Sequence, residues 1–276
     1  MADARPIAML DSGVGGLSIL REVRRRLPNE DVLYFADQGH VPYGPRPLEE
    51  IRGFVEAITR FFLDRDAKVI VVACNAASAA SLHYLRATFP GVPFVGMEPA
   101  VKPAAENSEN GVIGVITTKA TYQGALFASV IDRFASNVRV VTQVCPEFVR
   151  LVEAGDLDSA EVREAARAYL APLLEAGIDQ LVLGCTHFPF LTPVLQEIVG
   201  PNVDIVDPSP AVARQVGRVI AEQRNDEAHT GTLTFFTSGE PDAFRHLATR
   251  LLGEPLQPEQ VRAARWQGGE VVVPAR

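Results

Sequence analysis

The sequence predicts an α/β protein made of two similar domains, each a doubly wound parallel sheet, which face each other across a central crevice. Three observations support this prediction. Short runs rich in β-branched residues alternate with helical stretches, which is typical of parallel sheets wound by right-handed crossovers. The spacing of the strand ends in the first half recurs in the second half. One strand in each half ends at a cysteine, Cys74 or Cys185.

The composition is that of a globular protein. A chain of 276 residues is long enough for two ordinary domains, and 47% hydrophobic with 22% charged residues argues against a disordered chain. No apolar run approaches the length of a membrane-spanning helix. The first strand follows so soon after Met1 that it leaves no room for a secretory signal. We therefore expect a cytoplasmic protein with no membrane partner.

The net charge and the numbers of cysteines and lysines argue against nucleic-acid binding, a metal site and a pyridoxal cofactor. A net charge of -8 argues against a broad footprint for nucleic acid, so no nucleic-acid partner is expected. The three cysteines show no close C-x-x-C spacing, which predicts reduced thiols and no metal site. The only lysines are Lys68, Lys102 and Lys119, and none lies in a motif for a pyridoxal cofactor. We expect no cofactor.

Four strands are expected in the first half of the chain. They span 7–10, 32–36, 68–73 and 93–97, with helices over 17–27, 48–64 and 76–89. A tight glycine turn, Gly13 to Gly16, joins the first strand to its helix, but it matches neither the dinucleotide fingerprint nor a P-loop. The nearby carboxylate of Asp11 would also repel an anion. Turn geometry accounts for Gly13, Gly15 and Gly16 about as well as a functional role does, whereas it does not account for Asp11 and Ser12.

The second strand ends at Asp37 and opens an irregular loop over 38–45, which contains Tyr43 and Gly44. Loops at the carboxyl ends of parallel strands carry ligands, so this loop is a candidate part of a site. Asp37 itself fits a loop-capping carboxylate as well as a site residue. Four of the five histidines are expected to be solvated or on helix surfaces: His40, His83, His229 and His246.

A second series of strands begins near residue 111. Its strands are expected over 111–116, 138–142, 180–184 and 203–206, with helices entering near Tyr122 and spanning 159–175. The intervals between successive strand ends agree within a few residues between the halves, comparing Asp11, Asp37, Cys74 and Glu98 with Thr118, Cys145, Cys185 and Asp207. This agreement indicates a duplicated four-strand β/α unit, and each sheet is expected to be of the flavodoxin-like kind.

The last part of the chain is expected to return to the first unit. It contains a helix from 210 to about 224, a polar link over 225–231, a strand over 232–239 and a helix over 243–252. The predicted first domain therefore comprises residues 1–98 and 210–276. The second domain comprises residues 99–209.

The two cysteines at strand ends are the candidate reactive groups. Each sits where a parallel strand hands over to a helix, and at Cys74 the helix macrodipole favours a thiolate. A single buried cysteine is more simply an apolar filler, but two matched cysteines, each followed by polar residues, indicate function. Those polar residues are Asn75 in one unit and Thr186 with His187 in the other. Cys145 precedes a proline and is expected to be structural.

Two thiols on opposite faces of a small molecule suit a reaction that inverts stereochemistry. One thiol removes a proton and the other supplies a proton to the far face. A thiol with a pKa of about 8.5 is a weak base towards a carbon acid, so the site must also stabilise negative charge on the substrate. Backbone N–H groups after the cysteines can do so. Asp11 and His187 are the available groups to relay protons.

These residues resemble the glutamate racemases, within the wider aspartate/glutamate racemase superfamily. The resemblance rests on Asp11-Ser12-Gly-Val-Gly-Gly, Pro42-Tyr43-Gly44, Cys74-Asn75, Thr117-Thr118 with Thr121, Cys145-Pro146-x-Phe148 with Glu153, and Gly184-Cys185-Thr186-His187. It runs from residue 7 to about residue 250, and the joint order of the motifs is specific. The Thr-His pair and the Pro-Tyr-Gly loop favour glutamate over aspartate.

The resemblance implies a cofactor-independent racemisation of L- and D-glutamate that supplies D-glutamate for peptidoglycan, in a homodimer. It implies that Cys74 is the base for the D-enantiomer and Cys185 the base for the L-enantiomer. Asp11 would assist Cys74, and His187, held by Glu153, would assist Cys185. The implied substrate contacts are Asp11, Ser12, Tyr43, Gly44, Asn75, Ala76, Thr118, Thr121, Thr186 and His187. Ala76 departs from the family pattern, which has Thr or Ser there.

Two other functions fit the same residues. The chain can be a racemase or decarboxylase of another small acid, because two thiols do not by themselves select a side chain. It can also be a binding or regulatory protein that keeps the fold, for instance an acidic partner of a DNA-binding enzyme. Assays with a series of small acids as substrates distinguish the first alternative from a glutamate racemase. Activity that needs both thiols argues against the second.

Overall fold

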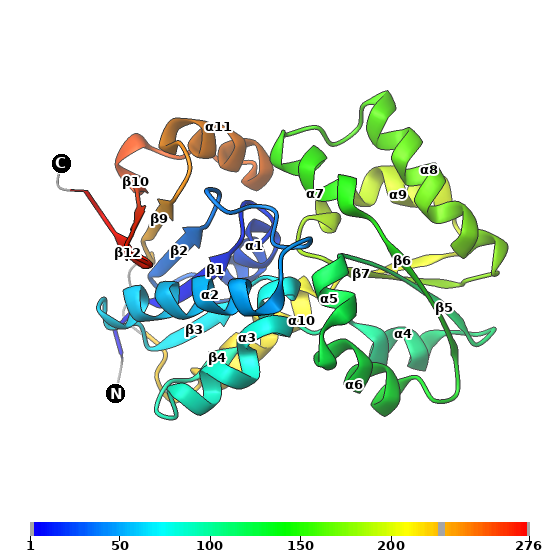
Figure 1. The fold of residues 1–276 in the computed structure, drawn as a ribbon, viewed down its shortest axis with the longest axis horizontal. Helices are drawn as coiled ribbons and strands as arrows, with labels where there is room; N and C mark the ends of the chain where they lie inside the picture. Colours follow the sequence, from blue (N-terminus) through cyan, green and yellow to red (C-terminus); the bar gives the residue numbers. More distant parts are fainter. Residues whose placement is uncertain (1–2, 226–229, 275–276) are drawn as a thin grey trace.

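Two parallel sheets form two lobes that lie side by side (Figure 1). The computed structural model describes residues 3–225 and 230–274. The first sheet has six strands in the order β10 (Val261–Ala263), β9 (Leu233–Thr237), β2 (Val32–Ala36), β1 (Ile7–Asp11), β3 (Val69–Val72), β4 (Phe94–Val95). The second has four, in the order β6 (Arg139–Val144), β5 (Val112–Thr117), β7 (Gln180–Gly184), β8 (Asp204–Val206). Neighbouring strands are parallel in both sheets.

The strand order confirms the duplicated unit. The order β2-β1-β3-β4 of the first sheet recurs as β6-β5-β7-β8 in the second. Strands β9 and β10 extend only the first sheet, so the chain does return to it after β8, as predicted. The domain limits at 98/99 and 209/210 stay a prediction. The division of the strands between the two sheets supports it.

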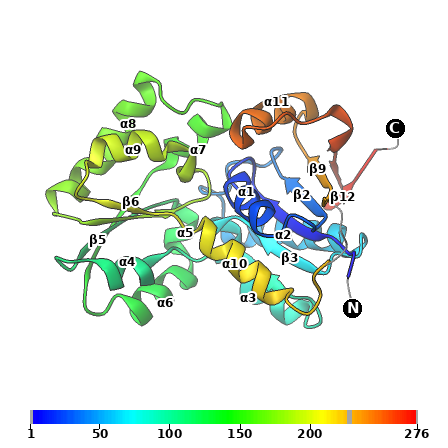
Figure 2. The ribbon, with the colours of Figure 1, turned by 180° about the vertical axis from the view of Figure 1, so that it is seen from behind.

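Helices cover both faces of the first sheet because its strands are apolar on both sides. In β1, Ile7 and Met9 face the cluster that includes α1 (Leu17–Arg26), α10 (Ser209–Val219) and α11 (Pro241–Leu252). The alternate residues, Ala8 and Leu10, face α2 (Leu48–Leu63) and α3 (Asn75–Thr88). The rear view shows α10 lying beside α1 (Figure 2).

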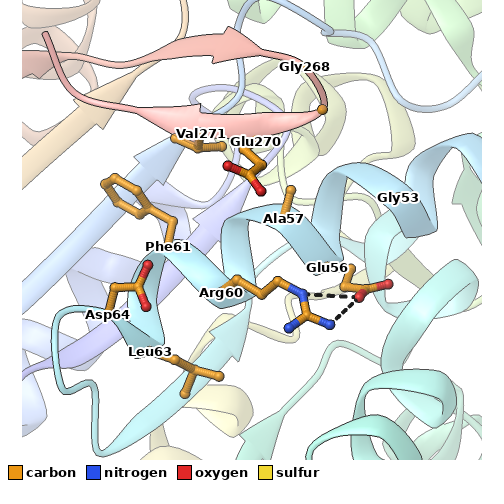
Figure 3. A pocket seen from close by; sticks show the side chains of 11 residues that line it. Gly53, Glu56, Ala57, Arg60, Phe61, Leu63, Asp64, Gly268, Glu270 and Val271 are labelled. Atoms are coloured by element: carbon orange, nitrogen blue, oxygen red, sulfur yellow. Dashed lines mark hydrogen bonds and ion pairs between the residues drawn. The ribbon is translucent and has the colours of Figure 1, made fainter.

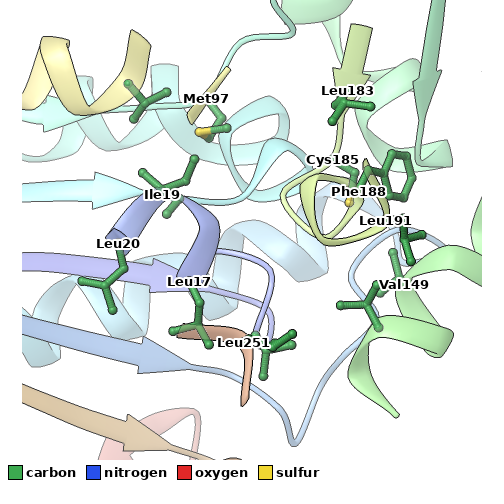
Figure 4. Packing of buried hydrophobic residues seen from close by; sticks show 14 of the residues in the cluster. Leu17, Ile19, Leu20, Met97, Val149, Leu183, Cys185, Phe188, Leu191 and Leu251 are labelled. Carbon is green, nitrogen blue, oxygen red and sulfur yellow. The ribbon is translucent and has the colours of Figure 1, made fainter. Parts of the chain in front are cut away.

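The second sheet is covered in the same way. Helices α4 (Val101–Asn107) and α6 (Ala125–Phe134) pack on one face, and α7 (Pro146–Glu153), α8 (Ala160–Glu175) and α9 (Thr192–Val199) pack on the other. The short helix α5 (Lys119–Gln123) and the 3-10 turn η1 (Phe188–Leu191) follow the ends of β5 and β7. One apolar cluster runs through both lobes, from Leu17 and Met97 to Cys185 and Phe188 (Figure 4). The lobes therefore share a core beside the crevice.

Several elements differ from the sequence prediction. The helix expected to reach residue 224 ends at Val219, and the fourth strand is only Phe94–Val95. Helices α4, α7 and α9 were not predicted, nor were β10, the 3-10 turn η2 (Pro258–Gln260) or the hairpin of β11 (Arg265–Gln267) and β12 (Glu270–Val272). Three-residue strands are too short to show a periodicity in sequence. His229 and part of the polar link lie outside the described residues.

No helix within residues 3–225 and 230–274 has both the length and the apolar character to cross a membrane.

Candidate active site

Cys74 lies where the sequence predicted, between β3 and α3. It is the N-cap residue of α3, in an extended conformation with φ −144° and ψ 125°, so its side chain projects beyond the carboxyl edge of the sheet. The residue is buried, with 5% of its surface exposed. Its Sγ lies 4.0 Å from the Ser12 Oγ at the end of the neighbouring strand β1. Two adjacent strand ends thus contribute to one site.

Cys185 holds the equivalent position after β7 in the second lobe. It is also buried, at 6% exposed, and its Sγ lies 3.7 Å from the His187 Nδ1. Both cysteines are free thiols, as is Cys145. Cys145 lies in the apolar core and makes a weak contact of 3.6 Å from its Sγ to the Gln143 carbonyl. The two thiols singled out by the sequence are therefore the ones that flank the crevice.

A single cavity between the lobes is lined by both thiols. Its lining contains nine of the predicted site residues together with Val149: Ser12, Tyr43, Gly44, Cys74, Asn75, Ala76, Thr118, Cys185 and His187. The cavity volume is only about 10 Å³, near the minimum of about 10–15 Å³ that one water needs. Behind this lining, Thr121 and Glu153 contact the lining residues Thr118 and His187 through hydrogen bonds, and Asp11 and Thr186 bond to each other.

His187, which is buried, and Glu153, which is largely buried, form an ion pair beside Cys185. The His187 Nε2 and the Glu153 Oε1 are 2.6 Å apart, which leaves Nδ1 directed at the Cys185 thiol. Burial alone would lower the pKa of His187, but its contacts with Cys185 and Glu153 raise that pKa well above the ordinary value. Burial would likewise raise the pKa of Glu153, but the hydrogen bond with His187 lowers it overall. The charged pair is therefore favoured.

The first lobe supplies the remaining partners of Glu153. The backbone N–H of Val14 donates to the Glu153 Oε1 at 2.7 Å, and the Gln38 amide donates to Oε2 at 3.1 Å. These bonds cross the boundary between the lobes and fix the carboxylate that orients His187. The sequence analysis did not identify Gln38, because a polar residue in a loop carries no signal of a partner that lies far away in sequence.

The glycine turn after β1 makes room for this pair. A Cβ atom added at Gly13 would overlap the Glu153 carboxylate, and one added at Gly15 would overlap the His187 ring and the Thr186 hydroxyl. None of these glycines has a positive φ. These glycines are needed because the second lobe approaches the turn closely here. Their role is therefore to leave space for Glu153 and His187, and it is neither to bind phosphate nor to permit the turn itself.

Asp11 lies between the two halves of the site. It is fully buried and accepts hydrogen bonds from the Gly13 N–H at 3.1 Å and the Thr186 Oγ1 at 3.3 Å. Burial raises the pKa of this carboxyl group, while the positive charge on His187 opposes the rise. Asp11 is therefore poised to carry a proton more readily than an ordinary aspartate.

At Cys74, burial opposes the thiolate that the helix terminus was expected to favour. Burial raises the pKa of the thiol well above its ordinary value, and the nearby Asp11 raises it further. Backbone N–H groups of Ala77 and Ser12 lower the pKa, but they do not compensate. Desolvation thus outweighs the helix terminus.

Polar groups that lack partners point to a ligand in the cavity. The Asn75 side chain is buried, and neither its Oδ1 nor its Nδ2 has a hydrogen-bond partner among the described residues. Leaving such groups unpaired costs about 1–3 kcal/mol each, so a polar ligand is the natural partner. In the second lobe, the hydroxyls of Thr118 and Thr121 are 3.0 Å apart, and the Thr118 hydroxyl caps helix α5.

The loop over 38–45 contributes Tyr43 and Gly44 to the cavity, as predicted. Asp37 does not line the cavity but accepts a hydrogen bond from the Tyr43 hydroxyl at 2.7 Å, so it is a loop-organising carboxylate. The expectation of a solvated His40 is wrong. Its ring stacks on Phe54 with centroids 4.0 Å apart, and its Nδ1 lies 2.9 Å from Asp37.

Val149 is a lining residue that the sequence analysis missed. It lies on α7, four residues after Cys145, and nothing in the sequence distinguishes it from the other apolar residues of that helix. Within the described residues there is no group of three or more His, Cys, Asp or Glu side chains that could hold a metal ion.

The comparisons with known proteins agree with this geometry. Residues 17–216 match the model of the family described as Asp/Glu/Hydantoin racemase. The chain belongs to this family. It is 49% identical over 251 residues to the glutamate racemase of Roseiflexus sp. (strain RS-1), covering 90% of this chain and 92% of that protein. It is 46% identical over 255 residues to the glutamate racemase of Stutzerimonas stutzeri (strain A1501), covering 92% and 97% of the two chains.

Solved structures of the family share the fold. The glutamate racemase isoform RacE1 from Bacillus anthracis superposes with a TM-score of 0.85 at 32% identity, covering 96% of this chain and 98% of that chain. The Escherichia coli glutamate racemase, solved with L-glutamate and an activator, gives 0.83 at 31% identity, covering 96% and 100%. The Francisella tularensis enzyme, solved with D-glutamate, gives 0.83 at 29%, covering 95% and 97%. The resemblance inferred from the motifs is confirmed.

Proposed function

We propose that this chain interconverts L- and D-glutamate by a two-base mechanism that uses Cys74 and Cys185 and no cofactor. The observation that carries the proposal is the pair of buried thiols, one at the end of β3 and one at the end of β7, which line a single cavity. The names of the relatives support the substrate, since those with 46–49% identity are glutamate racemases.

Each thiol acts on one face of the substrate. Starting from D-glutamate, the Cys74 thiolate takes the proton from Cα, and the electron pair of that C–H bond passes into the adjoining carboxylate. The Cys185 thiol then gives its proton to the opposite face of Cα, which yields L-glutamate and a Cys185 thiolate. The reverse reaction begins at Cys185. A proton must afterwards return between the two thiols, by way of solvent or the neighbouring acids.

The surroundings of each thiol suit this exchange. The raised pKa of Cys74 makes its thiolate a stronger base once formed, although little thiolate is present at neutral pH. Asp11, whose pKa is raised by burial, is placed to exchange protons on this side. On the other side His187, kept protonated by Glu153, donates towards the Cys185 sulfur. It both stabilises a thiolate there and supplies its proton.

The proposed substrate contacts come from both lobes. Asn75, Ser12 and Thr118 offer hydrogen-bonding groups on the cavity wall, with Tyr43 and Gly44 from the loop and Thr121 and Thr186 behind them. Backbone N–H groups at the start of α3 are suited to the α-carboxylate and to the charge that spreads into it. Ala76 lines the cavity without a hydroxyl.

We infer that the cavity widens between the lobes when glutamate enters. The cavity volume of about 10 Å³ holds no amino acid, and the lining residues come from both lobes. Closure after binding would then exclude water from the two thiols and complete the Glu153 contacts from the first lobe.

The wider role proposed is the supply of D-glutamate for peptidoglycan, in the cytoplasm, by a homodimer. The homodimer rests on the family resemblance alone. Sedimentation that shows only monomer at micromolar concentration would remove that part of the proposal.

The activity is tested by circular dichroism of purified, cofactor-free protein mixed with L- or D-glutamate. We expect the ellipticity of either enantiomer to decay to zero as the racemate forms. A stable signal with glutamate, combined with turnover of another small acid, would identify a different substrate. A stable signal with every acid tried would favour a binding protein.

A further inference from the structure

The carboxylate of Asp37 has four side-chain partners, which come from three parts of the chain. This carboxylate is fully buried. It accepts from the Tyr43 hydroxyl at 2.7 Å, the Ser238 hydroxyl at 2.7 Å and the Trp266 Nε1 at 2.8 Å, and it also contacts the His40 Nδ1 at 2.9 Å. The donors come from the cavity loop, from the end of β9 and from the C-terminal hairpin. Such a convergence holds the loop by several independent bonds.

The Trp266 side chain is held in place by aromatic packing and by the hairpin on which it lies. Its ring packs edge-on against His40 at 5.0 Å and Phe54 at 5.5 Å between centroids. The hairpin lies over α2, with Val271 above Ala57 and Phe61 (Figure 3). Since α2 is part of the first lobe's packed core, the indole N–H is presented to Asp37 from a fixed direction.

Tyr43 is the end of this chain of contacts that faces the cavity. Its ring is 1% exposed and lies beside Cys74 and Asn75 in the cavity lining. It also packs on Phe54, at 5.7 Å between centroids. A change in the position of Tyr43 would therefore change the wall that receives the substrate.

We propose that Trp266 and Asp37 are positioning residues, through which the C-terminal hairpin sets the place of Tyr43 and Gly44 against the substrate. The inference rests on the proposed function, because it takes the cavity to be the glutamate site. It adds a role for the hairpin, which lies far from Cys74 and Cys185 in sequence and contacts the cavity loop through Asp37, His40 and Phe54. A hairpin that merely covers α2 would need no buried bond from its indole to Asp37.

The test replaces Trp266 with Phe, which keeps an aromatic ring on Phe54 but removes the donor to Asp37. We expect the KM for L-glutamate to rise by about three- to tenfold, the effect of one lost hydrogen bond in the wall, with kcat changed by less than about twofold. Arg265→Ala is the matched control, because Arg265 is exposed on the same strand. It should leave KM unchanged.

A double-mutant cycle with Tyr43→Phe shows whether the effect passes through Tyr43. In the Tyr43→Phe background, which removes the hydroxyl bonded to Asp37, Trp266→Phe should raise KM little further. Fully additive effects, or an unchanged KM with only a lower melting temperature, would overturn the proposal and leave the hairpin a structural cover.

Amide hydrogen exchange separates failure of this proposal from failure of the proposed function. Exchange over residues 38–45, measured without any ligand, should be faster in Trp266→Phe than in the wild type and in Arg265→Ala. Unchanged exchange in that loop contradicts the positioning role. If the loop does loosen but the wild-type protein racemises no glutamate, the hairpin still positions the loop and the assigned reaction is wrong.

Discussion

At the scale of residues, the site depends on which charges are paired behind the thiols. Glu153 and His187 are mutually stabilised, whereas Cys74 faces Asp11, a carboxyl group that would repel a thiolate if it were ionised. The two thiols are therefore not equivalent. Cys185 lies beside a cation and Cys74 beside a carboxyl group whose pKa is raised by burial, an asymmetry that their matched strand–helix contexts in sequence do not show.

The pH dependence of stability tests the Glu153–His187 pair. The lowered pKa of Glu153 contributes stability that is present above its unfolded value near 4.5 and lost as pH falls through the folded value. The raised pKa of His187 contributes stability that is complete below its unfolded value near 6.5 and lost as pH rises through the folded value. The pair therefore stabilises most between these two values.

Glu153→Gln should accordingly lower the free energy of unfolding by about 2 kcal/mol between those pH values, with a smaller difference at higher and lower pH. Chemical denaturation over a pH series measures it. Glu161→Gln is the control, since Glu161 pairs with Arg150 at the surface and should cost little at any pH. A loss that does not vary with pH would count against the ion pair.

Ala76 is the residue where the chain departs from its family pattern. Ala76→Thr should lower the KM for glutamate by a few-fold, and by no more than about tenfold, because one neutral hydrogen bond contributes about 0.5–1.5 kcal/mol. Ala76→Val has a similar shape without the hydroxyl and is the matched control. It should not lower KM. If Thr and Val change KM equally, the hydroxyl does not contact the substrate and only the volume of the side chain matters.

At the scale of elements, the glycine turn after β1 is one of the places where the first lobe contacts the second. Gly15→Ala should displace His187 and lower kcat/KM for L-glutamate by at least about tenfold, since a small misplacement of a catalytic group is costly. Steady-state kinetics by circular dichroism measures the change.

Gly53→Ala is the control for that substitution. Gly53 lies within α2, and a Cβ there meets nothing within 4 Å. It should leave kinetics unchanged and stabilise the protein by about 0.5–1 kcal/mol. A Gly15→Ala variant with wild-type kinetics would show that His187 tolerates displacement.

The sequence predicted the regular elements and the thiols because each has a local pattern. Buried parallel strands appear as continuous apolar runs, and the repeat makes Cys74 and Cys185 stand out. Contacts that join distant segments have no such pattern. Gln38, Val149 and Trp266 entered the account only through the fold, and the raised pKa of Cys74 depends on burial between lobes that sequence spacing does not reveal.

At the scale of the whole molecule, a buried ion pair ties the first lobe together at the end opposite the site. The Lys68 Nζ lies 2.6 Å from the Glu30 Oε2, as an ion pair without ideal hydrogen-bond alignment, and donates to the carbonyls of Asp3 and Gln223 at 2.6 and 2.9 Å. The Asn225 N–H donates to the Glu30 Oε1 at 2.9 Å. The start of the chain and the segment after α10 thus meet at one lysine.

Lys68→Met should lower the free energy of unfolding by about 3–5 kcal/mol, because it leaves the Glu30 charge buried without its cation. The KM for glutamate should not change, since Lys68 precedes β3 and Cys74 follows it. Adding Glu30→Gln should restore part of the stability, as the uncompensated charge is then gone. Urea denaturation and kinetics of both variants check this. No recovery in the double variant would mean that the carbonyl contacts matter more than the ion pair.

The two-thiol crevice is the central claim, and the racemisation rates of three cysteine variants test it most directly. Cys74→Ala and Cys185→Ala should each abolish the loss of ellipticity of L- and D-glutamate, with far-UV spectra and melting temperatures close to those of the wild type. Cys145→Ala, which removes the buried thiol outside the cavity, should keep near wild-type rates. Near wild-type racemisation by either of the first two variants, or an equal loss in Cys145→Ala, would contradict the account.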